Sequence, residues 1–183
     1  DTPSLLIDMD LVRDNIAMMQ KKADKYGVSL RPHTKTHKMP ELAKLQIAAG
    51  ASGITVAKVG EAEVMAATGI SDIFIANQII GVSKLERIRQ LARHIRIRLG
   101  VDDPAQIDQL ETVFRDESHP VEVLIEIETG ENRSGIMQEE QLIRLVKHIQ
   151  AQTNVSLKGV FSHEGHTYKA KSSEDCRRLC LES

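Results

Sequence analysis

The chain has 183 residues, of which 41% are hydrophobic and 27% are charged, and its formal net charge is −2. That length and apolar fraction suit a domain with a buried core, and the near-neutral charge argues against a nucleic-acid-binding protein, which needs a clustered basic surface. No apolar run approaches the roughly 20 residues that cross a bilayer, and the two cysteines do not make a disulfide framework. We therefore expect a cytoplasmic protein without nucleic-acid or membrane partners.

Short β-branched or apolar runs alternate along the chain with longer amphipathic runs. The short runs, several of them apolar on both faces, predict buried strands at residues 28–31, 53–56, 73–76, 95–101, 121–126 and 157–162. The longer runs carry capping and stop signals and predict helices at residues 10–26, 40–49, 59–68, 83–93, 104–115 and 138–152, with a seventh from Ser172. This alternation is typical of the βα repeat of a parallel sheet.

Six such repeats without a glycine-rich phosphate-binding fingerprint favour a barrel over a doubly wound sheet. We expect an α/β fold, a (β/α)8 TIM-type barrel of which this chain holds about six βα units. No linker or low-complexity stretch divides the sequence. Residues 1–183 are therefore expected to be part of a single barrel domain in a longer enzyme.

Polar segments follow most of the predicted strands, at the end where barrel active sites lie. Lys35 comes just after the first strand, in the segment RPHTKTHK, among Arg31, His33, His37 and Lys38. Cationic neighbours disfavour a further charge, and so they favour the neutral amine that attacks a carbonyl and forms a Schiff base. A solvated basic loop is the alternative interpretation.

Two histidine pairs are similar to zinc-binding patterns without matching them. His33 and His37 are four residues apart, but Pro32 and the strand end disfavour the helix that such a pair needs. The segment HEGH is one residue shorter than HExxH, and Gly165 interrupts a helix there. We predict no metal site in this chain.

The last two polar segments hold further candidates. His163, His166 and Tyr168 in HEGHTY are placed to contact a cofactor or transfer protons, with ordinary loop polarity as the alternative. Glu126 and Glu128 alternate with isoleucines in EIETGENRSG, either as paired acids or with one of them holding Arg133. Arg133 itself is a candidate anion ligand.

The segments RPHTKTHK, EIETGENRSG and HEGHTY, in this order, resemble the fold-type III pyridoxal-phosphate enzymes of the D-threonine aldolase and D-serine dehydratase group. That group is a branch of the alanine racemase N-terminal barrel superfamily, and the resemblance covers essentially the whole chain. It implies that Lys35 forms the internal aldimine with pyridoxal phosphate, and that Arg133 approaches the phenolic oxygen of the cofactor. The other implied site residues are His33, His163, His166 and Tyr168, with Gln78 and Lys58 as weaker candidates.

The resemblance implies a lyase that acts on a small D-configured β-hydroxy amino acid, by retro-aldol cleavage or dehydration. A pyridoxal-phosphate-dependent racemase and a non-catalytic barrel protein that carries pyridoxal phosphate are the alternatives. The full-length enzyme is expected to be a homodimer and to use a divalent metal. The resemblance implies that the metal ligands belong to a C-terminal β-domain and the phosphate cup to later barrel strands, both of which we expect outside this chain.

Overall fold

The computed structural model describes residues 2–182. Its five strands form a parallel sheet in the order β1-β2-β3-β4-β5. They are β1 (Ile54–Val56), β2 (Asp72–Gln78), β3 (Arg96–Val101), β4 (Val121–Ile127) and β5 (Val155–Ser162). The chain divides into two compact units, Asp1–Ile75 with His94–Arg96 and Ala76–Arg93 with Ile97–Ser183. We describe each unit by itself.

Seven helices and two short 3-10 turns accompany the strands among the described residues. The helices are α1 (Met9–Lys25), α2 (Pro40–Ala48), α3 (Val59–Ala67), α4 (Val82–Ala92), α5 (Pro104–Val113), α6 (Glu139–Gln150) and α7 (Ser173–Leu181). The turns are η1 (Thr34–Thr36) and η2 (Gly165–Lys169). None of the helices within residues 2–182 has the length and apolarity that crossing a membrane requires.

The strand predicted at residues 28–31 is wrong, so the structure has five strands rather than the expected six. The segment lies beside β1 but accepts its hydrogen bonds there: Leu30 O from Ser52 N, and Pro32 O from Thr55 N. A continuous β-ladder also needs N–H groups of the segment to donate to carbonyl groups of β1, and Pro32, which follows the predicted strand, has no N–H group. An isolated parallel bridge, His33 to Thr55, replaces the ladder.

The first unit is built on α1, α2 and the pairing of β1 with β2. Ile54, Thr55 and Val56 pair in parallel with residues 73–75, and all three are buried. The Asp8 side chain caps α1 by accepting from two backbone N–H groups of its first turn. Pro40 begins α2, where a missing N–H group costs nothing.

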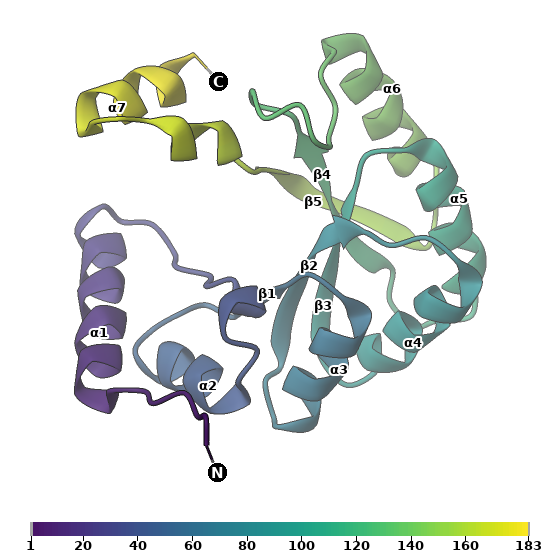
Figure 1. Ribbon diagram of the computed structural model, residues 1–183. Coiled ribbons are helices and arrows are strands. Elements are labelled where there is room, and N and C mark those ends of the chain that lie inside the picture. The colour runs from purple at the N-terminus through teal and green to yellow at the C-terminus, as the bar shows by residue number, and fades with distance from the viewer. Residues whose placement is uncertain (1, 183) are drawn as a thin grey trace. The chain divides into compact units, whose positions relative to one another are not determined.

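The second unit is built on β3, β4 and β5, which pair in parallel. Helices α5 and α6 pack against β5, and α4 packs against α5 (Figure 1). The core consists of fully buried aliphatic side chains from these elements, among them Leu85, Ile88, Leu99, Ile107, Leu110, Ile125 and Leu145. One face of this part of the sheet is therefore apolar, whereas the alternating positions include the ion-paired Arg98, Glu122 and Lys158.

A capping box begins α5 directly after β3. The Asp103 side chain accepts from Ala105 N at 2.8 Å, and Gln106 Oε1 accepts from Asp102 N at 3.0 Å and Asp103 N at 3.2 Å. Gln106 is 2% exposed. The buried side chain of Gln106 thus holds the backbone of Asp102.

Replacing Leu85 with alanine tests the packing of α4 in the second unit. Leu85 is completely buried, and truncating such a leucine to alanine costs about 2–5 kcal/mol through lost burial and the cavity left behind. Val82 begins the same helix and is 62% exposed, so Val82→Ala is the matched control, expected to stay within about 0.5 kcal/mol of the parent. Urea unfolding of the full chain measures both, and equal effects would contradict this packing.

Candidate functional site

Lys35 lies on the turn η1, which contacts β1 through the residues just before the lysine. Thr34 is buried, and its hydroxyl donates to Thr55 O at 3.3 Å. His33 caps the turn, because its Nδ1 accepts from Lys35 N at 3.2 Å. The backbone of Lys35 is thus held by its neighbours while its side chain is exposed.

Two of the cations near Lys35 in the sequence have carboxylate partners of their own. Arg31 NH1 lies 2.8 Å from Asp72 Oδ1, and Lys38 Nζ lies 3.6 Å from Glu61 Oε1. The cationic cluster inferred from RPHTKTHK is therefore partly neutralised. The weaker candidate Lys58 precedes the first residue of α3 and is exposed, and its side chain makes no capping hydrogen bond.

Arg133 lies in the loop that follows β4, and that loop has a fixed backbone. Glu128 Oε1 accepts from Gly130 N at 2.8 Å and from Asn132 N at 2.7 Å. These two backbone N–H groups, that of Asn132 first, lower the pKa of Glu128. Gly135 has a φ of +98°, and a Cβ there would lie 2.9 Å from Glu128 N. The loop therefore needs glycine at this position.

Two carboxylates from neighbouring strands meet beneath this loop. Gln78 Nε2 donates to Asp102 Oδ2 at 3.0 Å and also to Glu126 Oε2, which is 4% exposed. The loop donates to the same pair: Gly135 N to Asp102 Oδ2 at 3.2 Å, and Ser134 Oγ to Glu126 Oε1 at 3.0 Å. Burial, and then the nearby charge of Glu126, raise the pKa of Asp102 against the opposing effect of its hydrogen bonds.

The side chain of Arg133 lies beside two carboxylates. Its NH2 is 3.9 Å from Glu126 Oε1, and its NH1 is 3.3 Å from Glu131 Oε2. His163 Nδ1 lies 2.8 Å from that same Glu131 oxygen. The ring of Tyr168 stands edge-on to His163, with centroids 6.0 Å apart. Of the two arrangements that the sequence left open for Glu126, the structure shows the contact with Arg133.

His166 lies on η2, against the same loop. A Cβ added to Gly130 would lie 3.3 Å from the His166 ring. His166 Nε2 is 3.5 Å from Leu179 O, on α7. Tyr168, on the same turn, is 81% exposed. The HEGHTY segment therefore packs its histidines on the Arg133 loop and leaves its tyrosine ring mostly open.

The second unit brings together five of the predicted site residues: Gln78, Arg133, His163, His166 and Tyr168. The structure places His33 and Lys35 in the first unit, after the carboxyl end of the segment that runs beside β1. Sequence reasoning missed Asp102 and Glu131. The signal for Asp102 was present, since the polar pair in VDDP directly follows β3.

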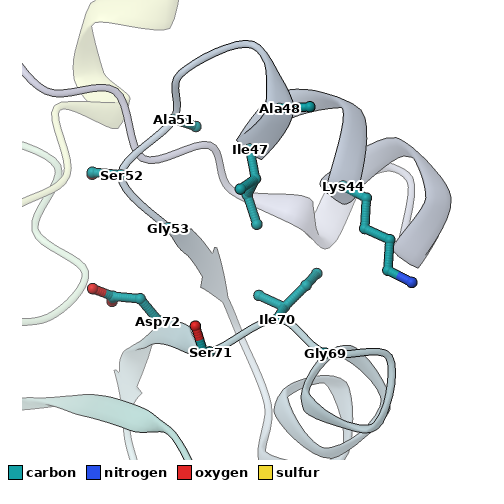
Figure 2. Close-up of a pocket in the computed structure, with 10 residues that line it drawn as sticks. All are labelled: Lys44, Ile47, Ala48, Ala51, Ser52, Gly53, Gly69, Ile70, Ser71 and Asp72. Carbon is teal, nitrogen blue, oxygen red and sulfur yellow. The ribbon is translucent and has the colours of Figure 1, made fainter.

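The first unit also contains a pocket of about 300 Å³. Its lining includes the residues just before β1 and just before β2 in the chain. Figure 2 shows Ile47 and Ile70 facing each other across the pocket. None of the predicted site residues lines it. Within residues 2–182, no three His, Cys, Asp or Glu side chains gather as a metal ion would require.

Comparisons with known proteins agree on one group of relatives. The chain is 34% identical over 183 residues to a D-threonine aldolase of Arthrobacter sp, covering 100% of this chain and 48% of that protein. It is 37% identical over 181 residues to a D-threo-3-hydroxyaspartate dehydratase of Delftia sp. (strain HT23), covering 98% of this chain and 47% of that protein. This chain thus spans about half the length of the curated relatives that it matches.

Solved structures give the same result. The crystal structure of D-threonine aldolase from Filomicrobium marinum matches with a TM-score of 0.95 at 35% identity, covering 100% of this chain and 49% of that one. The model of the family described as "Alanine racemase, N-terminal domain" matches residues 7–180. The α/β architecture, the parallel sheet and this match over nearly the whole chain lead to one conclusion. The chain belongs to the alanine racemase N-terminal domain family.

Proposed function

We propose that the protein containing this chain is a pyridoxal-phosphate-dependent lyase that cleaves or dehydrates D-configured β-hydroxy amino acids. The observation that carries this proposal is the exposed amine of Lys35 on a turn fixed to β1, in a chain whose relatives include D-threonine aldolase and D-threo-3-hydroxyaspartate dehydratase. We extend the proposal to the complete (β/α)8 barrel and to a homodimer of the full-length enzyme. The divalent metal would be bound by residues outside this chain.

The residues present fit pyridoxal phosphate. Lys35 supplies a primary amine, and among residues 2–182 no hydrogen bond or ion pair engages its Nζ. The Arg133 side chain is 50% exposed and supplies a guanidinium cation. His163 and His166 supply imidazole rings. An aldehyde cofactor with an acidic phenol needs an amine to hold it, a cation beside its phenolate and groups against its ring.

Each residue has a proposed role. Lys35 would hold the cofactor covalently, and Arg133 would donate to its phenolic oxygen. His33, Gln78 and Tyr168 would contact the cofactor. When bound, pyridoxal phosphate supplies an electron sink for negative charge that develops at the substrate Cα. His163 and His166 would hold and transfer protons at their ring nitrogens.

The attachment of the cofactor tests this proposal directly. Borohydride reduction of the full-length protein loaded with pyridoxal phosphate, followed by peptide mapping, is expected to place a pyridoxyl group on Lys35. Lys35→Ala should lose the label, and Lys38→Ala should keep it. A label on Lys38 or Lys58 in the parent protein would contradict the assignment.

The carboxylate pair beneath Arg133 gives a second prediction, on stability. Because its pKa is raised, Asp102 binds its proton more tightly in the folded chain than in the unfolded one. This tighter proton binding stabilises the folded chain at low pH. The stabilisation is lost as pH rises from the ordinary aspartate pKa of about 3.9 through the raised pKa of Asp102. The asparagine of an Asp102→Asn variant has no such proton to lose, and its side chain keeps an oxygen that accepts from Gly135 N.

We therefore expect the stability of Asp102→Asn relative to the parent to increase as pH rises from below that ordinary value to neutrality. Urea unfolding of the full chain across this range measures the difference. Asp14→Asn, at an exposed position of α1, is the control and should show no such trend. A difference for Asp102→Asn that stays constant, or falls with rising pH, would contradict the raised pKa of Asp102.

A further inference from the structure

Glu131 contacts two of the predicted site residues with a single oxygen atom. Its Oε2 lies 2.8 Å from His163 Nδ1 and 3.3 Å from Arg133 NH1. The side chains of Glu131 and His163 are only 28% and 27% exposed. Because a carboxylate accepts hydrogen bonds, this contact requires the proton of neutral His163 to be on Nδ1.

Gly165 provides a second, independent observation on the same carboxylate. A Cβ at this buried position would lie 2.3 Å from Glu131 Oε1 and 2.4 Å from Glu131 Cδ. Gly165 does not have the left-handed φ that would by itself call for glycine. The close approach of Glu131 therefore explains why a residue without a side chain stands between the two histidines of HEGH.

The backbone around Glu131 is held without its side chain. Glu128 accepts from two N–H groups on the amino side of the loop, and Asp102 accepts from Gly135 N on the other side. Ile136 pairs with β4 through backbone hydrogen bonds, from Ile136 N to Glu126 O and from Glu128 N to Ile136 O. Removing the Glu131 carboxylate should leave this loop in place and change only the side chains that it contacts.

We propose that Glu131 is a positioning residue of the site. Its carboxylate holds the His163 proton on Nδ1, leaves Nε2 to accept or return a proton, and keeps Arg133 attached to the same oxygen. A carboxylate that orients an imidazole in this way also stabilises the imidazolium formed on proton transfer. The catalytic part of this inference rests on the proposed lyase function, but the coupling of the three side chains does not.

Two variants separate the charge of Glu131 from its position. Glu131→Gln keeps the shape of the side chain and removes the charge. Gly165→Ala keeps the charge and displaces the carboxylate, since the new Cβ occupies its place. Glu140→Gln is the control, because Glu140 is an exposed carboxylate on α6 whose side chain is 86% exposed and pairs only weakly with Arg144, at 3.9 Å. Circular dichroism melting checks that each variant folds.

The first measurement needs no cofactor. Long-range ¹H–¹⁵N NMR of full-length protein labelled with [¹⁵N]histidine reports which ring nitrogen of His163 carries the proton. We expect Nδ1–H in the parent and in Glu140→Gln, and a shift toward Nε2–H, the tautomer that free histidine favours, in Glu131→Gln and in Gly165→Ala. An unchanged Nδ1–H tautomer in both folded site variants would overturn the inference.

The second measurement uses the loaded enzyme. Glu131→Gln is expected to lower kcat by roughly 10- to 100-fold, the usual effect of losing a partner that orients a functional histidine, with little change in KM. A change confined to KM would contradict the positioning role. Pyridoxyl labelling of Lys35 separates the two proposals. If Lys35 of the parent protein is not labelled, the proposed lyase function is refuted but the His163 tautomer is not. If Lys35 is labelled and the His163 tautomer is unchanged in both site variants, only the role of Glu131 is refuted.

Discussion

The amide of Gln78 holds two carboxylates from neighbouring strands together, and the loop that carries Arg133 is built on them. Asp102 directly follows β3 and Glu126 belongs to β4, so the pairing of these strands brings the two acids side by side. Backbone and hydroxyl donors of the loop then bind both acids. Buried carboxylates are costly unless hydrogen bonds satisfy them. The loop geometry and the satisfaction of the two acids therefore depend on each other.

The side-chain contacts extend from this foundation toward the candidate chemistry. Glu131 joins the guanidinium of Arg133 to the imidazole of His163, and Gly165 leaves the space that Glu131 occupies. Lys35 is held differently: its neighbour Thr34 donates to Thr55 O in β1, and His33 accepts from its backbone N–H. In each unit a rigid strand end holds the backbone while the functional side chain stays partly exposed, which suits groups that must meet a cofactor or substrate.

Local signals in the sequence predicted most of the fold, and a contact between distant segments accounts for the missed side chain of Glu131. Pro40 and Asp103 mark helix starts by local chemistry, so α2 and α5 begin where the sequence indicates. The strand predicted at residues 28–31 was wrong, because Pro32 cannot donate to a ladder. Arg133 and Lys35 were predicted as site residues from their own segments, but the contacts of Glu131 involve His163 and Gly165, more than thirty residues away.

The proposed lyase activity rests on the similarity to a D-threonine aldolase and a D-threo-3-hydroxyaspartate dehydratase, while a racemase with a related barrel would use much of the same framework. The decisive measurement is the fate of D- and L-threonine and of D- and L-3-hydroxyaspartate with the full-length protein, pyridoxal phosphate and a divalent cation. The account predicts that only D isomers react, giving glycine and an aldehyde by cleavage, or ammonia and a 2-oxo acid by dehydration. Interconversion of D and L isomers without cleavage or loss of water, or consumption of L isomers alone, would contradict it.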